Sequence, residues 1–320
     1  MKILITGCAG FIGFHLAEKL LKDFYEVYGI DNLNEYYGES LKDHRLRILK
    51  QNKNFNFKKV DLHNKNLLRD YFSEAKPSLV INLAAQAGVR YSRENPLAYM
   101  ESNVFGFINL IECMKEFGVK KLIYASSSSV YGDSKEIPFT EDANKENPVS
   151  LYGSTKLLNE ELASHYSNNF DFYAVGLRFF TVYGPYGRPD MAYYSFTRDI
   201  VNNKEITVFN RGMMSRDMTY ISDIVDGIES SIININKTKI KHQVFNLGNE
   251  TPIFLEKLIE KIEKKLNKKA RIIHKSSEDE VENTYADLKK AKSVLGYSPS
   301  ISFEEGMNNF FNWHDSYYGK

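Results

Sequence analysis

Short apolar runs alternate with amphipathic stretches over the first 180 residues of the chain. Residues 2–6 form an apolar run, residues 7–23 form a glycine-rich turn that opens an amphipathic helix, and residues 26–32 form a second apolar run. Strand, turn, helix and strand in this order indicate a βαβ unit. The alternation continues with strands expected at 55–62, 78–85, 121–129 and 173–180, and with helices expected at 66–75, 101–118 and 150–168. It predicts an α/β fold: a Rossmann-type, doubly wound parallel sheet covered by helices on both faces.

The rhythm changes after residue 180, where glycine, proline and tyrosine gather in residues 181–196 and shorter elements follow. We therefore divide the chain into a sheet domain, residues 1–180, and a smaller lobe, residues 181–320, that supplies one wall of a cleft. Part of the lobe's chain is expected to return to the first domain.

Gly7, Gly10 and Gly13 follow the first predicted strand, at the end of the sheet where open parallel sheets bind ligands. Glycines let the backbone approach a pyrophosphate, whose charge is stabilised by the helix N-terminus. A merely tight turn would show the same glycines, but here Asp31 also ends the second strand. Its carboxylate can accept hydrogen bonds from a ribose and would repel a 2′-phosphate, so residues 1–180 are predicted to bind NAD rather than NADP.

Charge and cysteine content narrow the class of protein. The 42 Lys and Arg residues balance 41 Asp and Glu residues, which argues against a nucleic-acid or membrane-surface partner. Cys8 and Cys113 are too few for a disulfide framework and fit a reducing compartment. The N-terminal apolar run is too short for a signal peptide, and no other run approaches the length of a membrane span. We therefore expect a soluble cytoplasmic protein, without a metal site.

Tyr152 precedes Lys156 by four residues in a predicted helix, after a strand that ends in a run of serines. Residues at this spacing share one helix face. Oxidising an alcohol requires a base for the hydroxyl proton, and a tyrosine with an ordinary pKa near 10 is too weak a base at neutral pH. A nearby ammonium and a positive nicotinamide would both favour the phenolate. The alternative is a pair of solvated side chains.

The glycine turn, the serine run and the Tyr-x-x-x-Lys pair together resemble the extended short-chain dehydrogenase/reductase family. The resemblance implies that Tyr152, Lys156 and Ser127 are catalytic, with Ser127 hydrogen-bonded to the reacting oxygen. Ser128 and Ser129 would either contact the substrate or only support the turn. The implied cofactor-binding residues are Gly7, Gly10, Phe11, Ile12, Gly13, Asp31, Asn32, Asp61, Leu62, Leu83, Ala84, Ala85, Tyr152 and Lys156.

This family contains epimerases, dehydratases, decarboxylases and reductases of nucleotide sugars. Its 4,6-dehydratases carry an Asp-Glu pair between the serines and a Tyr-Gly, and its decarboxylases carry a glutamate there. Residues 126–132 read SSSSVYG and contain no acid, which fits an epimerase that moves only one hydride. The stretches 29–46, 84–99, 125–132, 177–192 and 209–224 resemble bacterial UDP-glucuronate 4-epimerases.

The resemblance weakens toward the C-terminus. Met218 stands where an aromatic residue is common, and Ser222 stands where an acid is common. Residues 284–287 keep the TYAD motif, but the usual Gly-Asp-Val before it is missing. These departures concern the nucleotide-binding side of the cleft.

Three arginines are candidate substrate contacts. Arg188 lies in a loop that proline and glycine should fix, and its forked guanidinium matches a carboxylate; the alternative is a surface arginine paired with Asp190. Arg90 follows a strand-end loop and would contact the substrate or its diphosphate; the alternative is an arginine without a role in binding. Arg216 resembles the arginine that holds the diphosphate. Thr181 takes a place where hexose epimerases often have Asn. The predicted substrate-binding residues are Arg90, Ser127, Ser128, Thr181, Arg188 and Arg216.

We therefore predict NAD-dependent C4 epimerisation of a nucleotide-linked uronic acid, UDP-glucuronate to UDP-galacturonate, through a 4-keto intermediate. The alternatives are a 4-epimerase or reductase of another nucleotide sugar and a non-catalytic NAD-sensing regulator, which would be expected to lose Tyr152 or Lys156. Helices 101–118 and 150–168 resemble those that pair across a two-fold axis in the family, so we expect a homodimer. The resemblance also implies a role in polysaccharide biosynthesis.

Overall fold

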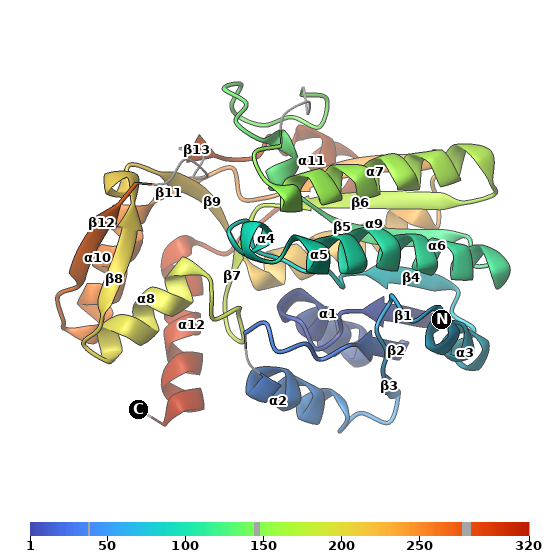
Figure 1. Ribbon diagram of the computed structural model, residues 1–320, viewed down its shortest axis with the longest axis horizontal. Coiled ribbons are helices and arrows are strands. Elements are labelled where there is room, and N and C mark those ends of the chain that lie inside the picture. Colours follow the sequence, from blue (N-terminus) through green and yellow to red (C-terminus); the bar gives the residue numbers. More distant parts are fainter. Residues whose placement is uncertain (38, 144–147, 277–282, 320) are drawn as a thin grey trace.

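The computed structural model describes residues 1–37, 39–143, 148–276 and 283–319 (Figure 1). Its centre is a seven-stranded parallel sheet with the strand order β10-β6-β5-β4-β1-β2-β3. The strands are β1 (Lys2–Thr6), β2 (Glu26–Asp31), β3 (Phe55–Lys59), β4 (Leu79–Asn82), β5 (Lys121–Ser127), β6 (Tyr173–Phe179) and β10 (His242–Leu247). The strand order reverses at β1, which is the switch point of a doubly wound sheet. The predicted fold is therefore confirmed.

Helices cover both faces of the sheet because side chains alternate along each strand. Ile3 and Ile5 point to a face covered by α1 (Phe11–Lys22) and α9 (Ile221–Ile235). Leu4 points to the other face, which is covered by α3 (Lys65–Ala75), α6 (Gly106–Glu116) and α7 (Leu151–Asn169). Helix α2 (Glu39–Leu49) packs beside α1.

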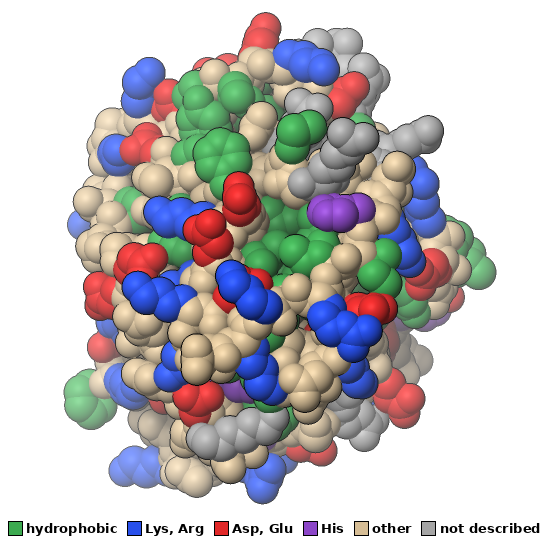
Figure 2. Space-filling view, turned by 90° about the vertical axis from the view of Figure 1, so that its left-hand side faces the viewer, with side chains coloured by type: hydrophobic (Ala, Val, Ile, Leu, Met, Phe, Trp, Pro, Cys, Tyr) green, Lys and Arg blue, Asp and Glu red, His purple; other side chains and the backbone are tan. Residues whose placement is uncertain are grey.

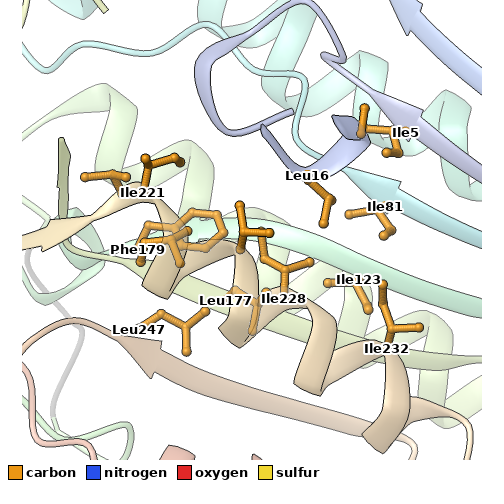
Figure 3. Packing of buried hydrophobic residues seen from close by; sticks show 14 of the residues in the cluster. Ile5, Leu16, Ile81, Ile123, Leu177, Phe179, Ile221, Ile228, Ile232 and Leu247 are labelled. Atoms are coloured by element: carbon orange, nitrogen blue, oxygen red, sulfur yellow. The ribbon is translucent and has the colours of Figure 1, made fainter. Parts of the chain in front are cut away.

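Figure 3 shows the core between α9, α1 and the sheet. Leu16 of α1, Ile228 and Ile232 of α9, and Ile123 and Leu177 of the strands are at most 2% exposed. Burying one such side chain stabilises the fold by about 1.5–3 kcal/mol relative to leaving it in water. Helix α9 lies beyond the predicted domain boundary at residue 180, so later residues complete the core of the sheet. The boundary itself stays a prediction.

The rest of the chain builds a smaller lobe around β9, which pairs with β7, β11 and β13. The lobe's elements are β7 (Thr181–Tyr183), β8 (Glu205–Phe209), β9 (Ser215–Tyr220), β11 (Pro252–Phe254), β12 (Arg271–Lys275), β13 (Asn283–Thr284), α8 (Ala192–Val201), α10 (Leu255–Leu266) and α12 (Phe303–Tyr318). Helix α11 (Lys289–Leu295) instead packs against α9 and β10 of the large sheet. Its core includes Tyr193, Ile262 and Phe310. On the side that carries β8, β12 and α10, apolar side chains gather between charged ones (Figure 2), and Ile272 and Ile273 of β12 are exposed.

Several predicted elements differ locally from the structure, and the strands expected at 55–62 and 78–85 end early, at Lys59 and Asn82. The helix expected at 101–118 opens as a π-helical turn, Met100–Phe105, in which the Asn103 side chain bonds the backbone of Gln86 and the hydroxyl of Thr155. The strand expected at 121–129 ends at Ser127, because Ser127 Oγ accepts the Ser129 N–H and starts a 3₁₀ turn. Two short helices, α4 (Tyr91–Glu94) and α5 (Pro96–Tyr99), precede the π-helical turn.

Cys8 and Cys113 are both buried and free of any disulfide. Within the described ranges, no helix is long and apolar enough to cross a membrane. The missing Gly-Asp-Val would fall next to the TYAD motif, and residues 277–282 of that stretch lie outside the described residues.

Candidate active site

The glycine turn between β1 and α1 packs too closely for side chains. Gly7 has φ +71°, and a Cβ added there would lie 2.7 Å from the Ala84 nitrogen. A Cβ on Gly13 would lie 2.1 Å from the Gly7 carbonyl oxygen. Helix α1 begins after Gly10 with no side-chain cap and no acid in its first turn. Its positive end is therefore open to an anion such as a pyrophosphate.

Asp31 ends β2 beside this turn and is 7% exposed. One carboxylate oxygen accepts the Ala9 N–H at 3.1 Å and the other accepts the Leu33 N–H at 2.9 Å. Each oxygen has a further lone pair for a ribose hydroxyl. Next to Asp31, the Asn32 amide donates to Asp61 at 2.9 Å. The turn and these carboxylates fit the pyrophosphate and the ribose of a dinucleotide.

A single cavity of about 820 Å³ brings the predicted site residues together. Every residue that the sequence assigned to the cofactor, to the substrate or to catalysis lines it. The size suits a cofactor together with a substrate. Sequence reasoning missed further lining residues: Asn34, Tyr36, Lys42, Gln86, Tyr91, Ser102 and Phe209. Asn34, Tyr36 and Lys42 lie within the stretch 29–46, which resembles UDP-glucuronate 4-epimerases. That resemblance is the signal by which these three residues could have been found.

Helix α7 places Tyr152 and Lys156 on the cavity wall. Ser150 caps this helix by accepting the Gly153 N–H at 3.1 Å, so Tyr152 lies in the first turn. Lys156 Nζ donates to the Ala125 carbonyl at 2.9 Å and lies 6.0 Å from the centre of the Tyr152 ring. The pair is therefore not two solvated side chains, since Lys156 is 1% exposed.

The electrostatics of Tyr152 differ from the expectation. Burial raises the pKa of its phenol, while the Ser127 hydroxyl and the Arg188 guanidinium lower it. Burial also lowers the pKa of Lys156 to about 8. In the protein alone, desolvation therefore outweighs the groups that favour the phenolate of Tyr152.

The four serines at the end of β5 and in the following turn have separate environments. Ser127 Oγ donates to Ser129 Oγ at 3.2 Å and accepts the Ser129 N–H, so Ser129 supports the turn. Ser129 also lines the cavity, and a contact with the substrate stays a prediction. Ser128 lines the cavity. Ser126 also lines the cavity, and its hydroxyl donates to Glu160 at 2.6 Å.

Arg188 both pairs with Asp190 and lines the cavity. Its Nε and Nη2 donate to the two Asp190 oxygens at 3.1 and 2.6 Å, and Tyr36 donates to the same carboxylate at 3.2 Å. Burial alone would raise the pKa of Asp190, but the Arg188 guanidinium holds this pKa below its ordinary value. The two readings of Arg188 are compatible, because a guanidinium has donors on more than one edge.

Arg90, Arg216 and Thr181 also line the cavity. Arg90 is exposed, and its guanidinium stacks 4.0 Å from the centre of the Phe209 ring, a cation–π contact. Arg216 extends from β9 and donates to the Ser215 carbonyl at 3.0 Å, and Thr181 opens β7. Three elements thus supply hydroxyl and guanidinium groups to one space.

A family model described as GDP-mannose 4,6 dehydratase matches residues 4–310. The chain belongs to this family. It is 42% identical to a UDP-glucuronate 4-epimerase of Thermodesulfobacterium geofontis. The alignment spans 315 residues and covers 97% of this chain and 95% of that relative. It is 45% identical to the Staphylococcus aureus protein CapI, with 100% of each chain covered. Its fold matches the UDP-glucuronic acid 4-epimerase of Bacillus cereus, crystallised with UDP-glucuronic acid and NAD, with a TM-score of 0.91 and 35% identity over 99% of this chain and 100% of that one.

Within the GDP-mannose 4,6 dehydratase family, this chain lacks the acids of the dehydratases between its serines and Gly132. The side chains in that stretch are those of serine, valine and tyrosine, and Val130 and Tyr131 are buried. Of the two departures near the C-terminal half, Met218 is buried and lines the cavity, while Ser222 is exposed and outside it.

Proposed function

We propose that this protein is an NAD-dependent 4-epimerase that converts UDP-glucuronate to UDP-galacturonate. The observation that carries the proposal is the convergence of Tyr152, Ser127, Lys156 and Arg188 on the cavity that also holds the open end of α1. The Bacillus cereus neighbour, crystallised with UDP-glucuronic acid and NAD, supports the same substrate and cofactor.

The reacting oxygen is the C4 hydroxyl of the sugar. Ser127 donates a hydrogen bond to this oxygen, and Tyr152 accepts its proton and later returns it. When bound along the glycine turn and Asp31, NAD would supply a hydride acceptor and donor for C4. Lys156, held by the Ala125 carbonyl, adds positive charge beside the phenol once it is protonated.

Arg188 holds the carboxylate that distinguishes a uronic acid from a neutral hexose. Oxidation at C4 makes the sugar a β-keto acid, which loses carbon dioxide when its carboxylate turns perpendicular to the ketone. A guanidinium that fixes the carboxylate by two hydrogen bonds prevents this rotation. Asp190 and Tyr36 already fix one edge of Arg188, so the rest of its fork is the part available to a substrate.

The test is incubation of purified protein with UDP-glucuronate and no added cofactor, with the C4 configuration of the product read by NMR. We expect UDP-galacturonate to form at catalytic turnover. UDP-glucose, UDP-N-acetylglucosamine and GDP-mannose form the comparison panel. Turnover of a neutral sugar instead, or consumption of added NADH, would replace the proposal by another 4-epimerase or by a reductase.

A homodimer is part of the proposal. Phe105 of the π-helical turn is 51% exposed, Leu158 of α7 is 39% exposed and Leu97 of α5 is 70% exposed, on elements that pack against one another. A second copy of the chain would cover this apolar surface. Light scattering should give twice the chain mass, and Leu158→Glu should shift the protein toward the monomer. A parent protein that is already a monomer would refute the dimer.

Cytoplasmic location and a role in polysaccharide biosynthesis stay predictions of the sequence.

A further inference from the structure

Arg45 of α2 is completely buried and connects two loops of the active site. Its Nη1 donates to the Ala9 carbonyl at 2.7 Å, in the glycine turn, and to the Tyr37 hydroxyl at 3.1 Å. Its Nη2 donates to the Tyr186 carbonyl at 2.5 Å and to the Gly187 carbonyl at 3.3 Å. One guanidinium thus bridges the cofactor turn and the residues immediately before Arg188.

The surroundings of Arg45 are unusual for a buried charge. In the part of the chain that the structure describes, no carboxylate pairs with this guanidinium, and its Nε has no hydrogen-bond partner. Burying a charge without a counter-charge is costly, and here only carbonyl and hydroxyl oxygens compensate for it. The arrangement therefore fixes geometry rather than serving as a strong ion pair.

The loop that Arg45 holds is strained. Tyr186 has φ +55°, a left-handed conformation that non-glycine residues rarely adopt, and the carbonyl of the preceding Pro185 accepts a hydrogen bond from His15 Nε2 at 2.9 Å. The centre of the Tyr186 ring lies 5.0 Å from the centre of the Phe14 ring and 5.0 Å from that of the Trp313 ring. Such a conformation persists only where several contacts impose it.

Three consecutive carbonyls, of residues 185, 186 and 187, are therefore held by side chains of α1 and α2. Arg188 is the next residue, and its side chain lines the cavity close enough to Tyr152 to lower the phenol's pKa. A small rotation of this loop would move the guanidinium relative to the reacting carbon, and misplacement by about 1 Å can cost a factor of about 100 in rate.

We infer that Arg45 is a positioning residue for the substrate carboxylate. It fixes the backbone before Arg188 to the glycine turn, so that the carboxylate clamp and the cofactor are held in one frame. The inference rests on the proposed function, because it takes a uronate as the group that Arg188 binds.

The test uses Arg45→Lys, which keeps a buried charge but cannot reach the acceptors on both sides. Dissociation constants for UDP-glucuronate and UDP-glucose are measured by calorimetry in the Tyr152→Phe background, where turnover is expected to be on the order of 10²–10⁴ times slower. We expect UDP-glucuronate to bind roughly tenfold more weakly, the effect of losing one charge-assisted hydrogen bond, and UDP-glucose to bind within about twofold of the parent. Arg47→Lys, at an exposed position of the same helix, is the matched control and should change neither constant.

A double-mutant cycle with Arg188→Leu separates positioning from general destabilisation. Once Arg188 is absent, Arg45→Lys should weaken UDP-glucuronate binding by no more than about twofold. Equal losses for the two ligands, additive losses in the cycle, or no loss at all would each overturn the inference. If Arg45→Lys fails to fold, His15→Phe removes only the bond to the Pro185 carbonyl and should show a smaller loss confined to UDP-glucuronate; equal losses for both ligands in that variant would overturn the inference as well.

The failure of the proposed function gives a different result. A parent protein that binds UDP-glucose as well as UDP-glucuronate has no carboxylate clamp, and the proposed function is then wrong. A parent that prefers UDP-glucuronate, together with an Arg45→Lys variant that keeps this preference in full, refutes only the role of Arg45.

Discussion

The cofactor wall and the substrate wall of the cavity are built by different means. On the cofactor wall, the shape of the backbone does most of the work: Gly7 and Gly13 leave no space for a Cβ, and α1 presents bare N–H groups. On the substrate wall, charged side chains carry the chemistry, and Arg188 depends on Asp190, Tyr36 and a loop tied to other helices.

The difference teaches where each wall is vulnerable. A wall made of backbone fails when atoms are added, because the backbone cannot move aside cheaply. A wall made of side chains fails when atoms are removed, and it also fails at a distance, when the residues that hold an arginine in place are changed. Substitutions of the two kinds should therefore have separable effects on cofactor and on substrate.

Tyr152 stands where the two walls meet, and its loss should have the largest effect. Tyr152→Phe removes the proton acceptor and keeps the ring, so turnover should fall by a factor on the order of 10²–10⁴ while UDP-glucuronate still binds. Initial rates with coupled detection of UDP-galacturonate check this. Tyr91→Phe, which changes another cavity-lining tyrosine whose hydroxyl contacts Asn95, is the control and should stay near the parent rate. Near-parental turnover of Tyr152→Phe would remove this residue from the mechanism.

Arg188→Leu tests the substrate wall alone. Binding of UDP-glucuronate should weaken by roughly 10- to 100-fold, as expected for lost hydrogen bonds between charged groups, and the NAD content should not change. Any 4-keto intermediate should lose carbon dioxide more often, leaving a UDP-pentos-4-ulose and NADH. Mass spectrometry of the products and absorbance of NADH measure both. Arg198→Leu, at an exposed arginine paired with Asp199, is the matched control. Normal epimerisation by Arg188→Leu would show that another group holds the carboxylate.

Gly13→Ala tests the cofactor wall alone. The added Cβ would meet the backbone at Gly7 and Cys8, so the turn must open, with a cost typical of overpacking, about 1–3 kcal/mol. We expect the purified variant to retain roughly tenfold less NAD, measured after denaturation. Gly118→Ala provides the contrast, since a Cβ there meets nothing within 4 Å although φ is +68°. If Gly13→Ala retained its NAD in full, close backbone packing would not be what defines this wall.

The smallest effect concerns the contact between the walls at His15. Burial lowers the pKa of His15 to about 4, so the folded protein resists protonation that the unfolded chain accepts near pH 6.5. As the pH falls from 7 to 5, the unfolded state binds more protons and the free energy of unfolding should drop by roughly 2 kcal/mol from this group. Urea unfolding of the parent and of His15→Phe at both pH values measures the difference, with His165→Phe, exposed on α7, as control. Equal pH dependence in the parent and in His15→Phe would contradict the assignment.

The cofactor wall could be predicted because its rules are local. The glycine turn, Asp31 and the Tyr152–Lys156 pair each follow from a short stretch of sequence and from a spacing that fixes geometry. The spacing could not predict the direction in which the pKa of Tyr152 shifts, since desolvation of the phenol depends on side chains from the whole cavity.

The substrate wall could be predicted only in its chemistry and not in its support. The sequence predicts Arg188 as a carboxylate ligand, but it does not show that the loop of Arg188 is held by Arg45, which lies 141 residues before Tyr186. Likewise, residues 242–247 form strand β10, and no local pattern suggests that its neighbour in the sheet is β6. Contacts between segments far apart in sequence have no short-range signature.

The late arrival of β10 has a consequence for synthesis of the protein. Strand β6 ends at Phe179, and its partner begins at His242, so the hydrogen-bonding edge of β6 stays open while the intervening residues are made. At about 5–20 residues per second, this interval lasts about 3–13 s. An open, apolar strand edge is a template for pairing with another chain. The risk of aggregation during expression is therefore set by this waiting time rather than by the stability of the finished sheet, and a chain cut at residue 180 would keep that edge permanently open.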